Sequence, residues 1–484
     1  MKKKGSVTLF FSLFLAVILV VIQVIFRSVQ IAGGKVQAET GVEEGLYSVF
    51  AGYDRELLKR YHVFFLDGGY GTGVLQPGRM YEQVEDKFLK SCSPGKIITD
   101  VRGENLWNCS KNTGAVTGIT LAADQDGRAF KIQAIDYMKD TLGIQGIQLL
   151  LQQVQQQKTI LDRQETDSTA EPVEQAQDEY QQAQGQVQEK KEEDSEFVNP
   201  LKVIALLKDK GILSLVLPLE AELSDAGFGE MEKMSSRSCT QGMGILYYGQ
   251  NPDNLTDNMI FREYMLKHLN YYGREDIKGK LPDGALQYQL EYALAGKDSD
   301  QENLKSVVGK LLGLREAANM VYLLKNSVRQ AQIHETALII CAATGLVALE
   351  EAVSLLLQAA WAFGESLLDV RQLLMGGKVP LVKTEQSWML SLSNLGKLPE
   401  ILQEGQTDQD SGLDYAGYLR LLLAAGSSKE QVLRTMDVAE QEMRCMAGKE
   451  NFRMDLCVSY LQVEMKFSCC GKNFTIQREY GYEM

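Results

Sequence analysis

The stretch Gly5–Phe26, GSVTLFFSLFLAVILVVIQVIF, decides the fold and the placement of this chain. It carries no charged residue, and from Val7 onward its polar interruptions are Thr8, Ser12 and Gln23. Because a helix rises about 1.5 Å per residue, the run can span the roughly 30 Å hydrocarbon core of a bilayer. Signal peptides usually have a shorter apolar region of about 7–15 residues. We therefore expect a retained anchor that contacts membrane lipid through residues 6–26. Cleavage after the small residues 32–34 is the alternative.

The charges on either side of the apolar run predict its orientation. Lys2–Lys4 precede it, whereas Arg27 and Lys35 follow it together with three glutamates up to Glu44. Because the excess of positive charge favours the cytoplasmic side, we expect a single-pass protein of the cell membrane with a cytoplasmic N-terminus. Most of the 484 residues would then be extracytoplasmic. A second apolar run, Thr336–Leu349, is about 14 residues long and is typical of a buried core helix.

Composition excludes one large class of partner. The formal net charge is -14, and the Lys and Arg residues are scattered among more numerous acids. A nucleic-acid-binding protein needs a basic surface that displaces counterions from phosphates. We therefore expect no nucleic-acid partner.

Pattern and composition divide the chain into four parts. Residues 1–27 are the basic tip and the anchor. Residues 28–151 are expected to form a juxtamembrane helix, whose apolar face includes Leu46, Val49 and Phe50, and a small α+β region. Residues 152–196 are rich in Gln and Glu and have few large apolar side chains, so they are expected to be a mobile spacer with helical tendency. Residues 197–484 are expected to form a mainly helical domain.

The last part changes from a helical to a strand period towards its C-terminus. Apolar residues recur at three and four positions in Leu349–Met375, which predicts a helix. From Phe452 they alternate, and the alternation changes phase near Tyr460, which indicates a bulge followed by a terminal hairpin. Residues 285–296, ALQYQLEYALAG, could supply a third strand. The predicted fold is α+β and mainly α: a single N-terminal transmembrane helix, then a helical extracytoplasmic domain with a small antiparallel sheet.

The eight cysteines all follow the apolar run. An extracytoplasmic location permits disulfides, and Cys92 with Cys109 is the expected loop-closing pair. Cys341 lies in an apolar helix and is expected to be an ordinary core residue. Neither a CxxC motif nor a zinc-like Cys/His spacing occurs in the sequence, so we expect no metal and no cofactor.

No catalytic motif is complete. The three histidines, His62, His268 and His334, are far apart in sequence, and HETAL at His334 lacks the second histidine of a zinc protease motif. The Ser-x-x-Lys pattern at Ser93–Lys96 lacks the companion elements of acyl-transfer enzymes. We expect a protein that is not an enzyme. The rival hypotheses are a cell-envelope enzyme, with His268 near acids around Asp276, and a surface adhesin.

One segment groups charges with a tryptophan. Its members lie between Asp369 and Leu392 and are Asp369, Arg371, Lys378, Lys383 and Trp388. They are explained either by a helix end with surface charges and a buried tryptophan or by an interaction surface. Both interpretations stay open at the level of the sequence.

Several stretches carry a family resemblance. Residues 5–39 resemble the N-termini of TadE/TadG-like pseudopilins, which are encoded with tight-adherence (Tad) pilus machinery. Residues 291–323, 361–392 and 413–425 resemble an uncharacterised Gram-positive bacterial family, domain of unknown function 5702, found near such machinery. The resemblance implies cellular context but no activity.

The resemblance also implies a processing site. Prepilins are cut after a glycine that follows basic residues, so Gly5–Ser6 is the expected bond. They carry a glutamate five residues into the mature chain, where this chain has Phe10. Together these features predict a membrane-anchored, extracytoplasmic structural or assembly component of a Tad-like pilus or secretion apparatus, which acts by contacts with other apparatus proteins.

Overall fold

The computed structural model divides the chain into two compact units. It describes residues 4–92, 95–98, 101–103, 107, 109–165, 170–186, 200–208, 211–218, 221–244, 252–274, 281–345, 347–402 and 411–482. Unit 1 combines Met1–Tyr137, Glu232–Asn254 and Met443–Met484, and unit 2 combines Met138–Met231 and Leu255–Glu442. The predicted fold class is confirmed: the structure is mainly helical, with a small antiparallel sheet and a long apolar N-terminal helix.

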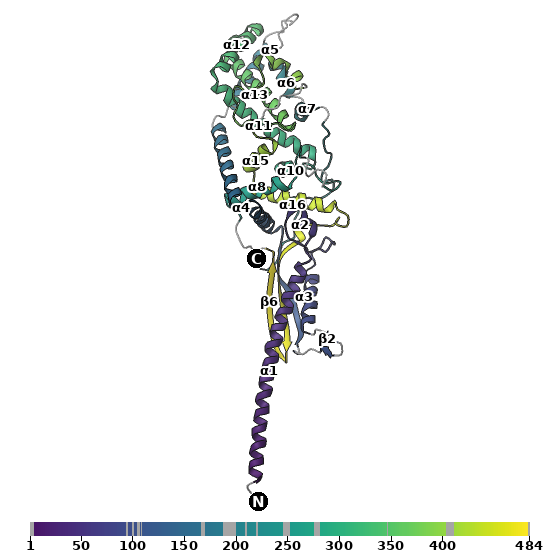
Figure 1. The fold of residues 1–484 in the computed structure, drawn as a ribbon. Coiled ribbons are helices and arrows are strands. Elements are labelled where there is room, and N and C mark those ends of the chain that lie inside the picture. The colour runs from purple at the N-terminus through teal and green to yellow at the C-terminus, as the bar shows by residue number, and fades with distance from the viewer. Residues whose placement is uncertain are drawn as a thin grey trace. The chain divides into compact units, whose positions relative to one another are not determined.

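Unit 1 is built on the helix α1, Lys4–Phe50. Figure 1 shows its N-terminal half free of other elements and its second half beside α3, Pro77–Cys92, and β6, Lys472–Gly481. The apolar run and the packed segment after it therefore form one helix. The chain turns after Phe50, and Asp54 caps α2, Arg55–Tyr61, by accepting hydrogen bonds from the amides of Glu56 and Leu57.

The sheet of unit 1 joins the two ends of the chain. Its central strand is β5, Cys457–Cys469, which pairs antiparallel with β4, Cys109–Leu121, along one edge. The short β1, Leu66–Asp67, and β6 pair with the other edge. A separate two-stranded sheet contains β2, Gly95–Ile98, and β3, Val101–Gly103. The predicted terminal hairpin is β5–β6.

The predicted bulge also lies where the apolar phase changes. Thr120 is opposite Tyr460 and Leu121 is opposite Val458, so Ser459 is the extra residue of β5. After this bulge, alternate residues of β5 from Leu461 to Cys469 are buried. They pack with α1 and α3 in one core, whose members include Ala38, Val42, Leu46, Met80, Val84, Phe88, Leu461, Val463, Met465 and Phe467.

Unit 2 is a helical bundle around α13, Glu350–Leu374. Almost every residue of α13 from Leu357 onward is buried, and it contacts α5, α6, α7, α11 and α12. The remaining helices of the bundle are α5 Ala170–Gln186, α6 Pro200–Lys208, α7 Ile212–Val216, α8 Leu255–His268, α10 Gln289–Ala295, α11 Asp300–Lys325, α12 Ser327–Thr344, α14 Leu398–Ile401 and α15 Tyr415–Ala425. Two further helices, α4 Asp124–Glu165 and α16 Ser428–Arg444, contain the boundaries between the units. Short 3-10 helices are η1 Met234–Ser236, η2 Val347–Leu349, η3 Leu392–Lys397 and η4 Met454–Leu456.

Three expectations from the sequence need correction. Residues 285–296 do not form a strand: Gln289–Ala295 is α10, with both of its faces buried and Gly296 closing it at a φ of 69°. Alternating apolar residues are equally compatible with a short helix buried on all sides. Residues 197–484 are not one domain either, because β5 and β6 belong to unit 1 with the N-terminal elements. The spacer was expected to have helical tendency, and α5 is helical, but its Ala176 and Tyr180 are buried, as a mobile spacer would not have them. These two residues are four apart, so one helix face suffices to bury them.

Candidate functional site

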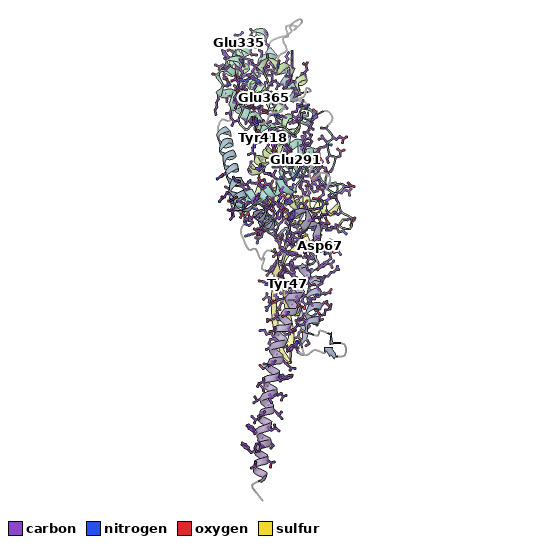
Figure 2. The ribbon with its side chains drawn as sticks, in the orientation of Figure 1. Tyr47, Asp67, Glu291, Glu335, Glu365 and Tyr418 are labelled. Atoms are coloured by element: carbon purple, nitrogen blue, oxygen red, sulfur yellow. The ribbon has the colours of Figure 1, made fainter. Side chains whose placement is uncertain are left out.

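The N-terminal half of α1 is an exposed apolar helix. Every described side chain from Val7 to Val29 is exposed, as Figure 2 also shows. The Ser12 hydroxyl donates to the Leu9 carbonyl oxygen at 2.9 Å, so this polar group is satisfied within the helix. An exposed apolar helix of this length is typical of a signal anchor or a membrane span. The predicted processing site, Gly5–Ser6, lies in the first turns of α1, and the Ser6 side chain is outside the described part.

A second helix also passes the length and composition criteria for a membrane span. This is Val347–Leu374, which contains α13. Unlike α1, it has charged side chains buried inside its own unit, including Glu365, Asp369 and Arg371. These groups are hydrogen-bonded to neighbouring protein segments, so α13 is the core helix of unit 2.

Burial of α1 begins one turn beyond its apolar half. The guanidinium of Arg27 donates to the Cys470 carbonyl oxygen at 3.1 Å, at the tip of the β5–β6 hairpin. A Cβ atom at Gly33 would lie 2.3 Å from the Trp107 ring, and one at Gly34 would lie 2.4 Å from Cys469 Sγ. Glycine is therefore required at both positions for the helix to approach the strands this closely.

The next glycines allow α1 to lie against α3. A Cβ atom at Gly41 would lie 3.0 Å from the Cα of Phe88, and one at Gly45 would lie 2.8 Å from the Cα of Val84. The spacing of four residues places both glycines on one face of α1. This Gly-x-x-x-Gly pattern was present in the sequence as GVEEG, but the sequence analysis did not single it out.

Polar and aromatic contacts join α1 to β6. The Arg478 guanidinium lies 2.8 Å from the Glu43 carboxylate and 3.2 Å from the Glu39 carboxylate. Tyr47, labelled in Figure 2, packs edge-on against Tyr480 with ring centroids 4.9 Å apart. The packed half of α1 is thus held to unit 1 by its core, by ion pairs and by rings.

The predicted interaction surface is not formed by its five residues. Asp369, Arg371, Lys383 and Trp388 are buried inside unit 2, and Lys378 alone of the five is exposed. We call the buried charges Arg315, Glu365, Asp369 and Lys383 the charge cluster. Of the two interpretations that the sequence left open, the buried positions agree with the one that has a buried tryptophan, and the charged groups find partners within the fold.

The centre of the charge cluster is the ammonium group of Lys383. It lies 2.6 Å from Glu365 Oε1 and 2.7 Å from Asp369 Oδ1, and it donates to the Ser387 carbonyl oxygen at 2.9 Å. Its hydrogen bonds go to Glu365 and Ser387, and Asp369 contacts it as an ion pair. The charged side chains of both acids are fully buried, which requires that they be paired.

Arg315 of α11 completes the cluster from the other side. Its Nε donates to Asp369 Oδ2 at 3.0 Å, and its Nη1 donates to the Pro380 carbonyl oxygen and the Tyr418 hydroxyl. Two carboxylates thus face two cations. Figure 2 labels Glu365 and Tyr418 at this part of the bundle.

Burial and pairing with Lys383 shift the pKa of Glu365 in opposite directions. Burial raises its pKa, and the Lys383 ammonium partly offsets this rise. Glu365 also accepts hydrogen bonds from the amides of Met389 and Leu390 at 2.9 and 2.8 Å. The cluster therefore fastens residues 380–390 to α11 and α13, and the Lys383 ammonium is closed off from solvent.

The other residues of the predicted patch have separate roles. The Trp388 indole donates to the Leu390 carbonyl oxygen and packs edge-on against Trp361 at 5.5 Å. Arg371 donates to the Leu217 carbonyl oxygen at 2.9 Å, away from the charge cluster. Its position at a helix end was evident in the sequence, but its partner was not.

The three histidines have separate neighbours. His62 stacks on Tyr137, His268 packs against Tyr264, and His334 lies 3.0 Å from the Glu350 carboxylate. Asp276 and Ser93 lie outside the described residues. Among the residues that are described, no group of three His, Cys, Asp or Glu side chains could hold a metal ion.

A tyrosine-lined cavity was missed by the sequence analysis. It has a volume of about 430 Å³, and its lining residues include Asn270, Tyr271, Tyr272, Arg274 and Tyr288. Behind Tyr272 lies Glu291 of α10, which accepts from the Tyr272 amide at 2.9 Å and the Tyr415 hydroxyl at 2.8 Å. Burial raises the pKa of Glu291 to about 7. The sequence signal for this site was Glu291, an acidic residue within a run of alternating apolar residues.

The predicted cysteine pair lies in unit 1. Cys92 ends α3 and Cys109 begins β4, and both are buried free thiols in the structure. Burial raises the pKa of each thiol to about 11. Their pairing stays a prediction. The structure adds Cys469 and Cys470 to this neighbourhood, which the sequence analysis did not anticipate.

Comparison with known families gives one assignment. Residues 188–469 match the model of a family of unknown function, DUF5702. Since the match covers more than half of the chain, the chain belongs to this family. No curated protein and no solved structure matches the chain.

Proposed function

We propose that the chain is a membrane-anchored, extracytoplasmic structural or assembly component of a Tad-like pilus or secretion apparatus, acting by protein–protein contacts. The observation that carries the proposal is the continuity of α1. One uninterrupted helix has an exposed apolar half and a second half buried against the sheet of unit 1. Such a helix transmits position from a membrane to a folded unit without a flexible joint.

The charges around α1 support the orientation. Lys2–Lys4 precede the apolar half, and acids from Glu39 onward follow it. The positive side faces the cytoplasm under the charge rule for membrane insertion. In this topology unit 2 and the part of unit 1 beyond the apolar half of α1 are extracytoplasmic, and the apparatus would meet them there.

The charge cluster supports a structural role for unit 2. Lys383, the residue of this segment best suited to act as a nucleophile or base, is paired with two carboxylates and donates to a carbonyl oxygen. Its side chain is fully buried. A lysine that serves as a nucleophile or base must reach its substrate. This lysine therefore serves the packing of unit 2 and the choice of a single fold.

Site-directed photocrosslinking in the native membrane tests the proposal. A photoreactive residue at Leu19, on the exposed apolar half, should capture an apparatus protein as well as lipid. A probe at Val36, exposed on the same helix beyond that half, should capture extracytoplasmic apparatus proteins. Recovery of lipid alone from Leu19, with no protein from Val36, would sink the proposal.

Two further measurements separate the alternatives. N-terminal sequencing of the mature chain should give Ser6 for prepilin-type processing, a start beyond Arg27 for a signal peptide, and Met1 or Lys2 for a simple anchor. Labelling of intact cells should fail until the wall is removed. Labelling with the wall in place would instead favour a surface adhesin.

A further inference from the structure

Four of the eight cysteines meet at one end of the sheet in unit 1. They come from three segments far apart in sequence: Cys92 ends α3, Cys109 begins β4, Cys469 ends β5, and Cys470 follows in the hairpin turn. This cysteine cluster lies under α1 where burial of the helix begins.

The strand register places two of the four directly opposite one another. Cys109 and Cys469 are paired residues of the antiparallel β4–β5 ladder. Opposed residues in such a ladder have Cα atoms about 4.5–5.5 Å apart, which lies within the range that a disulfide spans. Both side chains point to the same face, since a Cβ atom at Gly34 would lie 2.4 Å from Cys469 Sγ and 2.9 Å from Cys109 Sγ.

We propose that Cys109 and Cys469 form an interstrand disulfide in the mature protein. Each thiol loses its proton and one electron as the Sγ–Sγ bond forms. The two electrons and two protons pass to the disulfide of a thiol–disulfide oxidoreductase, which becomes a dithiol. An extracytoplasmic location makes such an oxidant available to the chain.

This pairing differs from the Cys92–Cys109 bond expected from sequence. Cys92 is also close to Cys109, so proximity alone does not separate the two partners. The difference is that the hydrogen bonds of two strands fix the backbones of Cys109 and Cys469 face to face. Cys470 is a further neighbour, since the sulfur atoms of Cys109, Cys469 and Cys470 all contact the Trp107 carbonyl oxygen. It lies in the hairpin turn, however, where the ladder gives it no opposing residue.

The surroundings indicate a permanent bond rather than an exchanging one. Burial raises the pKa of Cys92 and Cys109 to about 11 and that of Cys469 to about 12, so few of these thiols are ionised at neutral pH. Thiolates are the attacking species in disulfide exchange. Oxidation therefore takes place before α1 covers the sulfur atoms, and the bond persists afterwards.

The disulfide would close a covalent ring beneath the anchor helix. The chain between Cys109 and Cys469 contains all of unit 2. The disulfide would join the two ends of this segment at the ends of β4 and β5 that lie nearest the exposed apolar half of α1. Force applied through the anchor would then reach a covalent link rather than strand hydrogen bonds alone.

Peptide mapping of the full-length protein from its native membranes tests the pairing. Free thiols are trapped with N-ethylmaleimide under denaturing conditions, and the protein is digested with trypsin without reduction. The three sites fall in separate peptides, residues 91–96, 103–111 and 467–472. We expect peptides 103–111 and 467–472 to be linked. Fragmentation should assign the bond to Cys469, and Cys92 and Cys470 should be alkylated.

Other results would overturn the proposal. A link between peptides 91–96 and 103–111 would establish the Cys92–Cys109 pair instead, and alkylation of Cys109 would show that it is unpaired. Gly34→Val should lower the linked fraction several-fold, because its side chain would occupy the space of both sulfur atoms. Val36→Ala on the same helix and Cys341→Ser in unit 2 are the matched controls and should leave the linked fraction unchanged.

Discussion

The ammonium of Lys383 lies 2.7 Å from Asp369 Oδ1, and neither side chain reaches solvent. Lys383 belongs to the irregular segment after α13, whereas Asp369 lies on α13 itself. The pair therefore determines where this segment runs over the helix. Replacing only one partner leaves a buried charge without compensation, which costs more than the pair contributes.

Lys383→Met should therefore destabilise unit 2 by about 3–5 kcal/mol, because Glu365 and Asp369 would share the single cation Arg315. Denaturation followed by tryptophan fluorescence measures this effect. Trp361 and Trp388 lie close to the charge cluster, and the third tryptophan, Trp107, lies in unit 1.

Lys378→Met is the matched control for this substitution. Lys378 is exposed and lies in the same segment, so the change should alter stability by no more than about 0.5 kcal/mol. Equal stabilities of the two variants would show that the charge cluster does not hold the segment.

Glu291 predicts a pH dependence of the stability of unit 2. Its pKa is raised from 4.5 to about 7 because the carboxyl group is fully buried. Between these values the native state retains a proton that the unfolded state has released, so stability falls as pH rises from about 4.5 to 7. The shift corresponds to a loss on the order of 3 kcal/mol.

Glu291→Gln should remove this component. The amide oxygen can still accept from the Tyr272 amide and the Tyr415 hydroxyl, while the charge is gone. We expect the variant to gain stability over the wild type at pH 8 and to match it at pH 4.5. Thermal unfolding of the detergent-solubilised full chain at both pH values measures this difference. A constant difference would contradict the prediction.

The sequence could predict elements whose signal is local. The apolar run of α1, the helical stripe of α13 and the phase change at Ser459 are each visible in adjacent residues, and the structure has all three features. The type of α10 was predicted incorrectly because an element buried on all faces carries no polar face to reveal its period.

Contacts between residues far apart in the chain could not be predicted from local sequence patterns. β4 pairs with β5 across more than 300 residues, so the C-terminal hairpin gives no sign in the sequence that it belongs with α1. For the same reason Arg315, which lies 54 positions before Asp369, was absent from the predicted patch. A group of charged residues close together in sequence can form either an exposed surface or a buried cluster, and only the position of their partners decides between the two.

Gly45 predicts a substitution effect at the contact of α1 with α3. Gly45→Ala should destabilise unit 1 by about 1–3 kcal/mol, because its Cβ would lie 2.8 Å from the Val84 backbone and the helices would have to separate. Hydrogen exchange of the amides in α3 should rise in the variant.

Gly313→Ala provides a control of opposite sign. Gly313 is an exposed residue of α11, and a Cβ there meets no atom within 4 Å. Alanine in this helical position should stabilise unit 2 by about 0.4–1 kcal/mol. If both substitutions stabilised their units, close approach would not explain the glycine at position 45.

Removal of the first half of α1 should abolish membrane association and leave the fold of unit 1 intact. A chain without residues 1–29 loses the exposed apolar helix, whose transfer to a bilayer is favourable by on the order of 10 kcal/mol. It keeps Gly34–Phe50, which the core of unit 1 and the Arg478 ion pairs with Glu39 and Glu43 hold in place. We expect this chain to stay in the aqueous phase without detergent and to retain the unfolding transitions of both units.

Val36→Asp in the full chain, which changes an exposed residue outside the apolar half, should leave membrane association unchanged. Sedimentation with vesicles measures both variants. Continued sedimentation of the shortened chain would mean that another surface binds the membrane.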